Sequence, residues 1–203
     1  ANLDAFTEAI KSISYIGNYE FVSTMTKALP DNTDGYVYFA GATTTVPSTL
    51  DWNNALTELQ TKDIQIISTP STDASVHALI SAHCTSMSST VNKKERTCIL
   101  GSSIGLSDND GITNAKGLNS KYVSYIIDSA MANNPLTGEV ETISGAMLGV
   151  MCAAMESSMA INEPLTFKTL KVLGFGKYRT TPNMETLIKA GIMECNPKPE
   201  NIS

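Results

Sequence analysis

The chain has 203 residues, of which 42% are hydrophobic and 17% are charged, values typical of an ordinary globular protein. Its net charge is −6, and its lysine and arginine residues are scattered, so the sequence argues against nucleic acid as a partner. The most apolar run, 146–155, is half of the roughly 20 residues that a membrane span requires, and no signal peptide is recognisable, so we expect a soluble protein without a membrane partner.

The four cysteines are spaced far apart and form no C-x-x-C pair: Cys84, Cys98, Cys152 and Cys195. Three of them lie in apolar runs, where a free cysteine behaves as a small hydrophobe. We therefore favour a reducing compartment, and the sequence leaves a disulfide pairing open.

The first fifty residues are predicted to contain a helix and strands that lead into the rest of the domain. Residues 1–14 carry a helical apolar stripe, and 19–25 and 36–39 have strand patterns. Dense turn residues at 29–35 precede the second strand. A polar loop then runs to Thr49 and is too short to require separate domains.

The stretch from Asp51 to Gly101 is predicted to form helix, strand, helix and strand. Behind Asp51 as the N-cap, apolar residues follow helical spacing: Trp52, Ala55, Leu56 and Leu59. A β-branched strand at 64–67 stops before Pro70, helical spacing resumes over 76–87, and a second strand at 96–100 ends at Gly101. Two strands joined by a helical crossover form a βαβ unit, so we expect parallel strands covered by helices.

The next segments continue the alternation of helix and strand. We predict a loop over 102–111, a weak helix over 112–120, a strand over 122–127 and a loop over 130–139. Residues 144–159 are apolar almost all round, which is typical of a helix that is buried on every side. Four methionines in this helix are interpreted as core filling: Met147, Met151, Met155 and Met159.

The end of the chain has one well-marked helix. Residues 165–173 have no clear period, whereas Thr181 is a capping residue, Pro182 suits the first helical position and Gly191 ends the helix. A short strand is predicted over 192–195, followed by a polar tail. Because the chain opens at Ala1 without Met and ends in this tail, we expect an excised piece of a longer protein.

The predicted fold class is therefore α/β, with a mainly parallel sheet that is covered by helices on both faces and built on βαβ units. We predict one domain over 1–203, with residues 1–50 leading into a core at 51–195 and a polar tail at 196–203.

One cluster contains residue types that bind metals: Asp73, His77, His83 and Cys84. Zinc-binding helices place their ligands at i and i+4 on one face. His77 and His83 are instead six positions apart and point in different directions. Packed or surface histidines are the better interpretation, and we predict no metal site.

A Ser-His-Asp arrangement in the subtilisin order can be assembled from Asp31 or Asp34, His77 and Ser144. Chain order is weak support, because a catalytic triad is defined by its geometry. The G-x-S-x-G elbow of the α/β-hydrolases is absent from the sequence. A serine hydrolase remains an alternative, and no catalytic residue is predicted.

Other short motifs fail on a required position. Gly101–Gly105 follows a strand but lacks the endings of phosphate and dinucleotide loops, and Asp108–Gly111 lacks the twelfth-position Glu of a calcium loop. Asp128–Met131 lacks the second serine of a metal-dependent adhesion motif, and Asn201–Ser203 is a glycosylation acceptor only in a secreted protein. We predict no cofactor, and a generic α/β ligand-binding domain is the remaining alternative.

Several motifs follow one another in the order Tyr36-Val-Tyr-Phe-Ala-Gly41, Asp51-Trp-Asn-Asn-Ala-Leu56, Asp63-Ile-Gln-Ile-Ile67 with Pro70, Val76-His-Ala-Leu-Ile80, Arg96-Thr-Cys-Ile-Leu-Gly101, Tyr122-Val-Ser-Tyr125, Gly145-Ala146 with Ala153-Ala154, and Glu185-Thr-Leu-Ile-Lys-Ala-Gly-Ile192. Their order and spacing resemble those of the contractile tail sheath proteins of myophages, over roughly residues 36–195. Two features depart from that family. Ala40-Gly-Ala-Thr-Thr44 stands where the family often has Gly-Gly-x-Asp-Gly, and the C-terminal domain with its strand-exchanging arm does not follow the last helix.

The resemblance implies a virion structural protein that stacks in rings around a tail tube and has no catalytic residues. Its implied partners are other sheath subunits, the tail tube protein and the baseplate. The resemblance also implies a location in the phage tail after synthesis in the host cytoplasm. Because the linking arm of the family is absent from this sequence, we expect the isolated chain to be monomeric.

Overall fold

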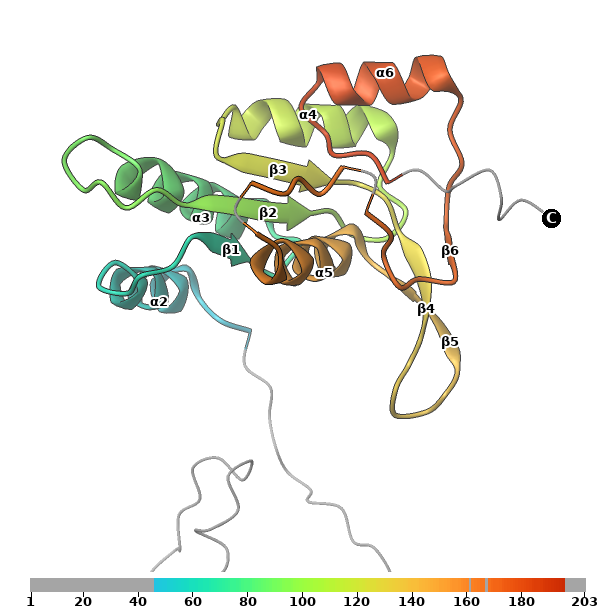
Figure 1. Ribbon diagram of the computed structural model, residues 1–203, viewed down its shortest axis with the longest axis horizontal. Helices are drawn as coiled ribbons and strands as arrows, with labels where there is room; N and C mark the ends of the chain where they lie inside the picture. The colour runs from blue at the N-terminus through green and yellow to red at the C-terminus, as the bar shows by residue number, and fades with distance from the viewer. Residues whose placement is uncertain (1–45, 161, 167, 196–203) are drawn as a thin grey trace, which may run out of the picture. The chain divides into compact units, whose positions relative to one another are not determined.

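The computed structural model describes residues 46–160, 162–166 and 168–195, which form five helices and two three-stranded sheets (Figure 1). The predicted helix at 1–14, the strands at 19–25 and 36–39 and the polar tail lie outside the described residues. The prediction of one domain over 1–203 therefore stays a prediction. None of the helices in the described ranges is long and apolar enough to span a membrane.

The first sheet is parallel, as the βαβ pattern predicts. Its strands β1 (Ile66–Ser68), β2 (Thr97–Gly101) and β3 (Val123–Ile126) lie in the order β1-β2-β3. Helix α3 (Ala74–Met87) connects β1 to β2, and α4 (Asp108–Leu118) connects β2 to β3. Crossover connections of this kind are what parallel neighbours require.

Successive residues of this sheet face two separate apolar clusters, because side chains alternate along a strand. Cys98 and Leu100 belong to the cluster that contains Ile80 of α3, whereas Ile99 belongs to the cluster that contains Leu148 of α5 (Gly145–Ser158). Helices α3 and α5 therefore pack on opposite sides of β2. Helix α2 (Thr49–Leu59) contributes its buried Leu56 to the α3 cluster.

The second sheet corrects the predicted fold class. Residues 130–139, which were predicted as a loop, contain β4 (Ala130–Asn133) and the turn of a hairpin to β5 (Val140–Ile143). Strand β6 (Gly174–Phe175) pairs with the other edge of β4, so the antiparallel order is β5-β4-β6. The fold is thus mixed α/β, and the prediction of a mainly parallel sheet is only partly confirmed. The strands of the hairpin are largely exposed and lack the apolar run that identifies a buried strand.

The start of α4 was also predicted wrongly. Ser107 is the N-cap, and its hydroxyl accepts a hydrogen bond from the Asp110 backbone N–H at 3.1 Å. The segment Asp108–Gly111 therefore forms the first helical turn rather than the end of the predicted loop, and its carboxylates lie at the positive end of the helix dipole.

The starts of two other helices, α2 and α6 (Thr181–Lys189), were also predicted at the wrong residue, because a different residue forms the N-cap. Ser48, not Asp51, caps α2, and Asp51 completes a capping box with it. Helix α6 begins after Thr180, one residue before the predicted cap.

The predicted strand at 192–195 is reduced to one parallel bridge between Ile192 and Tyr125. The described residues of 165–173 form no helix or strand.

Helix α5 occupies its predicted range but is not buried on every side. Its buried residues are mostly small: Gly145, Ala146, Leu148, Gly149, Cys152 and Ala153. None of the four methionines predicted to fill the core is fully buried, and Met147 is 44% exposed. Small residues are selected on the inner side because the helix lies almost against the strand backbone.

The closest approach joins Gly101, at the end of β2, to Gly145, at the start of α5. A Cβ atom at Gly101 would lie 2.1 Å from the carbonyl oxygen of Gly145, and a Cβ atom at Gly145 would lie 2.7 Å from that of Ile126. The Ala146 backbone N–H donates a hydrogen bond to the Ser102 carbonyl at 3.0 Å. The start of α5 is therefore bonded directly to the backbone that follows β2.

We predict that Gly101→Ala destabilises the protein by more than about 3 kcal/mol, because a methyl group cannot fit between two backbones. Gly117→Ala is the matched control, since a Cβ atom at this position of α4 would have no neighbour within 4 Å. It should stabilise the helix by about 0.5–1 kcal/mol. Urea unfolding followed by circular dichroism measures both changes, and equal midpoints for the two variants would contradict the proposed close contact.

Candidate functional site

Four charged residues meet beside the carboxyl end of the parallel sheet. Asp128 follows β3 closely, and Asp108 is the first residue of α4. Arg179 precedes α6, and Glu194 follows it. We call these four residues the Arg179 cluster.

The Arg179 guanidinium is enclosed by the three carboxylates. One of its Nη atoms donates hydrogen bonds to Asp128 Oδ1 and to Glu194 Oε1, the latter at 2.9 Å, while the other donates to Asp108 Oδ1 at 3.0 Å. The side chains of Arg179 and Asp128 are 2% and 1% exposed. Lys177, on the solvent side, donates to Asp108 Oδ1 at 2.8 Å.

The surroundings of Asp108 and Glu194 shift the pKa values of these two carboxyl groups in opposite directions. The hydrogen bond from Arg179 holds the pKa of Asp108 below its ordinary value. Burial, followed by repulsion from Asp128, raises the pKa of Glu194. Burial by itself lowers the pKa of Arg179, but hydrogen bonds with Asp108 and Asp128 outweigh this effect and raise it. Arg179 therefore stays charged, and Glu194 takes up a proton more readily than Asp108 does.

The arrangement suits a structural connection rather than substrate binding. The Nε atom and both Nη atoms of Arg179 already donate to carboxylates. Asp128 also accepts a hydrogen bond from the Cys195 backbone N–H at 3.1 Å. The cluster thereby fastens both ends of the segment 179–195 to the ends of β3 and α4, which lie far away in the sequence.

A second buried cation, Arg96, is 1% exposed and lies between α3 and the start of β2. One Nη atom donates to His83 Nε2 at 2.7 Å, and the other donates to the Lys62 carbonyl at 2.7 Å. Because arginine has no acceptor atom, His83 accepts through its Nε2 and is the neutral tautomer with its proton on Nδ1. Burial, and then the charge of Arg96, lowers the pKa of His83.

The structure does not bring the four metal-type residues together. His77 is buried, and its Nε2 lies 2.8 Å from the Ser71 carbonyl oxygen, while Asp73 caps α3 by accepting from the Ser75 N–H at 2.8 Å. His83 bonds to Arg96, and Cys84 is buried in the apolar cluster of α3. Over the described part of the chain, no group of three or more His, Cys, Asp or Glu side chains has an arrangement that could hold a metal ion.

Ser144 and His77 of the hypothetical triad are likewise engaged elsewhere. Ser144 is the N-cap of α5, and its hydroxyl accepts from the Met147 N–H at 3.2 Å. No hydrogen bond joins Ser144 to His77 among the described residues, and Asp31 and Asp34 lie outside them. Of the other motifs, Gly101–Gly105 begins with the glycine that contacts α5, and Asp108 and Asp128 belong to the Arg179 cluster. Asn201–Ser203 lies outside the described residues.

The cysteines are free thiols in the structure. Burial raises the pKa of Cys152 to about 11, and a hydrogen bond with Cys84 together with burial raises the pKa of Cys98. The thiolate is the reactive form of cysteine, so Cys98 and Cys152 behave as the small apolar residues that the sequence predicted.

Sequence reasoning missed Arg179 and Glu194 entirely. Arg179 lies 71 residues from Asp108 and 51 from Asp128, so no local spacing connects them. In the sequence, Arg179 stands alone between two turn-rich segments, and an arginine in such a position is ordinarily a surface residue.

A solved structure of similar fold is the sheath tail protein from Desulfitobacterium hafniense. The two have a TM-score of 0.58 and 15% sequence identity, and the match covers 73% of this chain and 32% of that protein. The chain thus spans about a third of that protein's length, and the likeness shows a shared fold. No family model and no curated protein matches the sequence.

We predict that Arg179→Met destabilises the protein by about 3–5 kcal/mol, because three crowded carboxylates then lose their only buried cation. Lys177→Ala, which removes the exposed cation of the same network, should cost about 0–1 kcal/mol. Chemical denaturation at neutral pH measures both values. Similar small losses in the two variants would show that the buried guanidinium is not required.

We also predict a specific pH dependence for Glu194→Gln. Because the pKa of Glu194 is raised by folding, its contribution to stability is complete below its unfolded pKa and is lost as pH rises through its folded pKa. The stability of the parent protein relative to this variant should therefore fall as pH rises above about 4.5, the ordinary pKa of a glutamate. Asp108→Asn is the control of opposite sign, since the pKa of Asp108 is lowered by folding. The stability of the parent protein relative to Asp108→Asn should stay constant above about pH 4 and fall as pH drops below the unfolded pKa of Asp108. A stability difference between the parent and Glu194→Gln that does not change above about pH 4.5 would contradict the assignment for Glu194, and a difference between the parent and Asp108→Asn that does not change in acid would contradict the assignment for Asp108.

Proposed function

We propose that this chain is the α/β part of a contractile tail sheath subunit, which stacks in rings around a tail tube and drives contraction during genome delivery. The observation that carries the proposal is the fold likeness to the Desulfitobacterium sheath tail protein over 73% of this chain. The order of the sequence motifs from residue 36 to residue 195 independently suggests the same kind of protein.

Under this proposal the chain is a non-catalytic component of the virion. Its partners are other sheath subunits, the tail tube protein and the baseplate, and it is made in the host cytoplasm before assembly. The metal-type residues and Ser144 are all engaged in packing or capping contacts, which supports a structural role over a serine hydrolase.

The internal contacts of the fold suit a part that moves as a rigid body. The start of α5 is hydrogen bonded to the backbone after β2, and the Arg179 cluster fastens the segment around α6 to β3 and α4. Packed interiors deform little, so rotation and sliding between subunits can occur without internal rearrangement. A sheath subunit of this kind would transmit force through its core.

We predict that the complete gene product containing this sequence forms tubes or contracted polysheaths, visible by negative-stain electron microscopy. The 203-residue chain alone should be mainly monomeric at micromolar concentration by light scattering. Exclusively small, uniform particles of the complete product under many ionic conditions would count against a sheath. A stable ring of the 203-residue chain, independent of concentration, would contradict the monomer expectation.

The hydrolase alternative has its own test. A fluorophosphonate probe should leave the protein unlabelled, because the Ser144 hydroxyl caps α5 and has no hydrogen bond to His77. Labelling of Ser144 that His77→Ala abolishes would replace the sheath proposal with an enzymatic one.

A further inference from the structure

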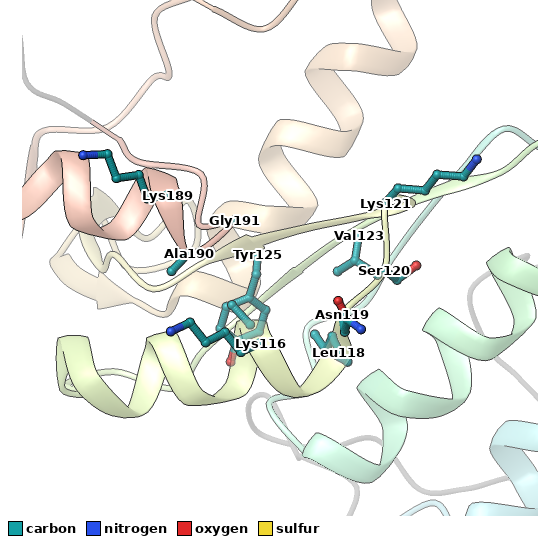
Figure 2. Close-up of a pocket in the computed structure, with 11 residues that line it drawn as sticks. Lys116, Leu118, Asn119, Ser120, Lys121, Val123, Tyr125, Lys189, Ala190 and Gly191 are labelled. Carbon is teal, nitrogen blue, oxygen red and sulfur yellow. The ribbon is translucent and has the colours of Figure 1, made fainter.

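A groove opens between the carboxyl ends of α4 and α6, beside β3 (Figure 2). Its volume is about 470 Å³, and Leu118, Val123 and Tyr125 provide apolar surface within it. Cavities of this size hold small ligands or a few side chains of a partner.

Three lysines border this groove: Lys116, Lys121 and Lys189. None of the residues that line it is acidic. Lys189 has one weak neighbour outside the groove, Glu185, at 3.8 Å, and both side chains are mostly exposed. The groove is therefore positively charged on a chain whose net charge is −6.

Helix capping accounts for only part of this charge. Lys116 and Lys189 lie in the last turns of α4 and α6, where a cation favours the helix dipole. Lys121 follows the end of α4 and lies 5.0 Å from the ring centre of Tyr122. Its ammonium group adds a third positive charge, which is not explained by a favourable interaction with a helix dipole.

The β4–β5 hairpin has the opposite character. It projects from the body of the fold and points away from α4 and α6 (Figure 1). Leu136 at its tip is 92% exposed, and Glu139 and Glu141 are exposed behind it. The sequence has no lysine or arginine between Lys121 and Lys168, so the whole hairpin lacks a cation.

The tip of the hairpin is held in one shape by its own hydrogen bonds. The Asn134 backbone N–H donates to the Glu139 carbonyl at 2.8 Å, and the Gly138 N–H donates to the Asn134 carbonyl at 2.8 Å. The Leu136 N–H donates to Asn134 Oδ1 at 2.9 Å. A preformed tip loses little conformational freedom when it binds.

We propose that the hairpin tip of one copy inserts into the lysine-bordered groove of a second copy. Leu136 would cover the apolar surface of the groove, and Glu139 and Glu141 would face the lysines. Because groove and hairpin are different surfaces of one chain, the contact is head-to-tail and can continue from copy to copy as a ring or a helix. Its use in ring assembly rests on the proposed sheath function, whereas the pairing of the two surfaces does not.

The contact between isolated copies is weak and sensitive to salt, because its charges are exposed and screened. Sedimentation velocity of the 203-residue chain near millimolar concentration should show association at about 20 mM salt that decreases at about 500 mM salt. This weak association is compatible with a monomer at micromolar concentration.

Charge reversal tests the two surfaces separately. Lys116→Glu with Lys121→Glu reverses the groove, and Glu139→Lys with Glu141→Lys reverses the hairpin. Each double variant alone should associate at least about tenfold more weakly than the parent. A mixture of the two should recover association, because the native hairpin of the groove variant then meets the native groove of the hairpin variant, and the two reversed surfaces also attract each other.

A matched control separates this effect from net charge. Lys62→Glu with Lys171→Glu changes two exposed lysines away from the groove and alters the net charge equally. It should associate more strongly than the groove variant. Circular dichroism should show that every variant remains folded, since all substituted side chains are exposed.

The proposal is wrong if the parent chain shows no association at low salt. It is also wrong if the mixture does not recover association, or if reversal of the groove weakens association and reversal of the hairpin does not. Failure of this proposal differs from failure of the sheath function. If the complete gene product forms tubes and both charge reversals leave those tubes unchanged, the contact is rejected and the sheath function stands. If the mixture recovers association but the complete product forms no tubes, the contact stands and the sheath function is rejected.

Discussion

The rest of the fold depends on the near contact of two backbones, where Gly101 at the end of β2 meets Gly145 at the start of α5. This contact requires glycine on both sides, and it sets the distance between helix and sheet. The Ala146 N–H then bonds to the Ser102 carbonyl, and Ser102 bonds to Ile126 of β3. Helix α5 is therefore joined to two neighbouring strands at once, which explains why its inner side is made of small residues.

The Arg179 cluster extends this arrangement to the end of the described chain. A buried charge network contributes little net stability, because desolvation of the ions opposes their attraction. Its directional hydrogen bonds nevertheless require one position for the segment around α6 relative to β3 and α4. The core thus combines apolar packing on both sides of β2 with buried polar connections, of which the Arg179 cluster and the contacts of Arg96 are two.

Charge is distributed unevenly over that surface. The hairpin and α5 belong to a stretch without lysine or arginine, whereas the carboxyl ends of α4 and α6 gather three lysines around a groove. Such segregation has no effect on the core, because these side chains are exposed. It matters for association, where opposite charges on different surfaces of one chain favour ordered head-to-tail contacts.

The sequence by itself determined the βαβ unit, the range of α5 and the absence of a recognisable catalytic motif, because these follow from local periodicity and spacing. Only the tertiary structure decided the rest. The exposed hairpin at 130–143 carries no apolar run, the outer position of Met147 depends on which side of α5 meets the sheet, and capping by Ser107 moved the start of α4. Arg179 met its carboxylates through contacts between segments 51 and 71 residues apart, which no local pattern records.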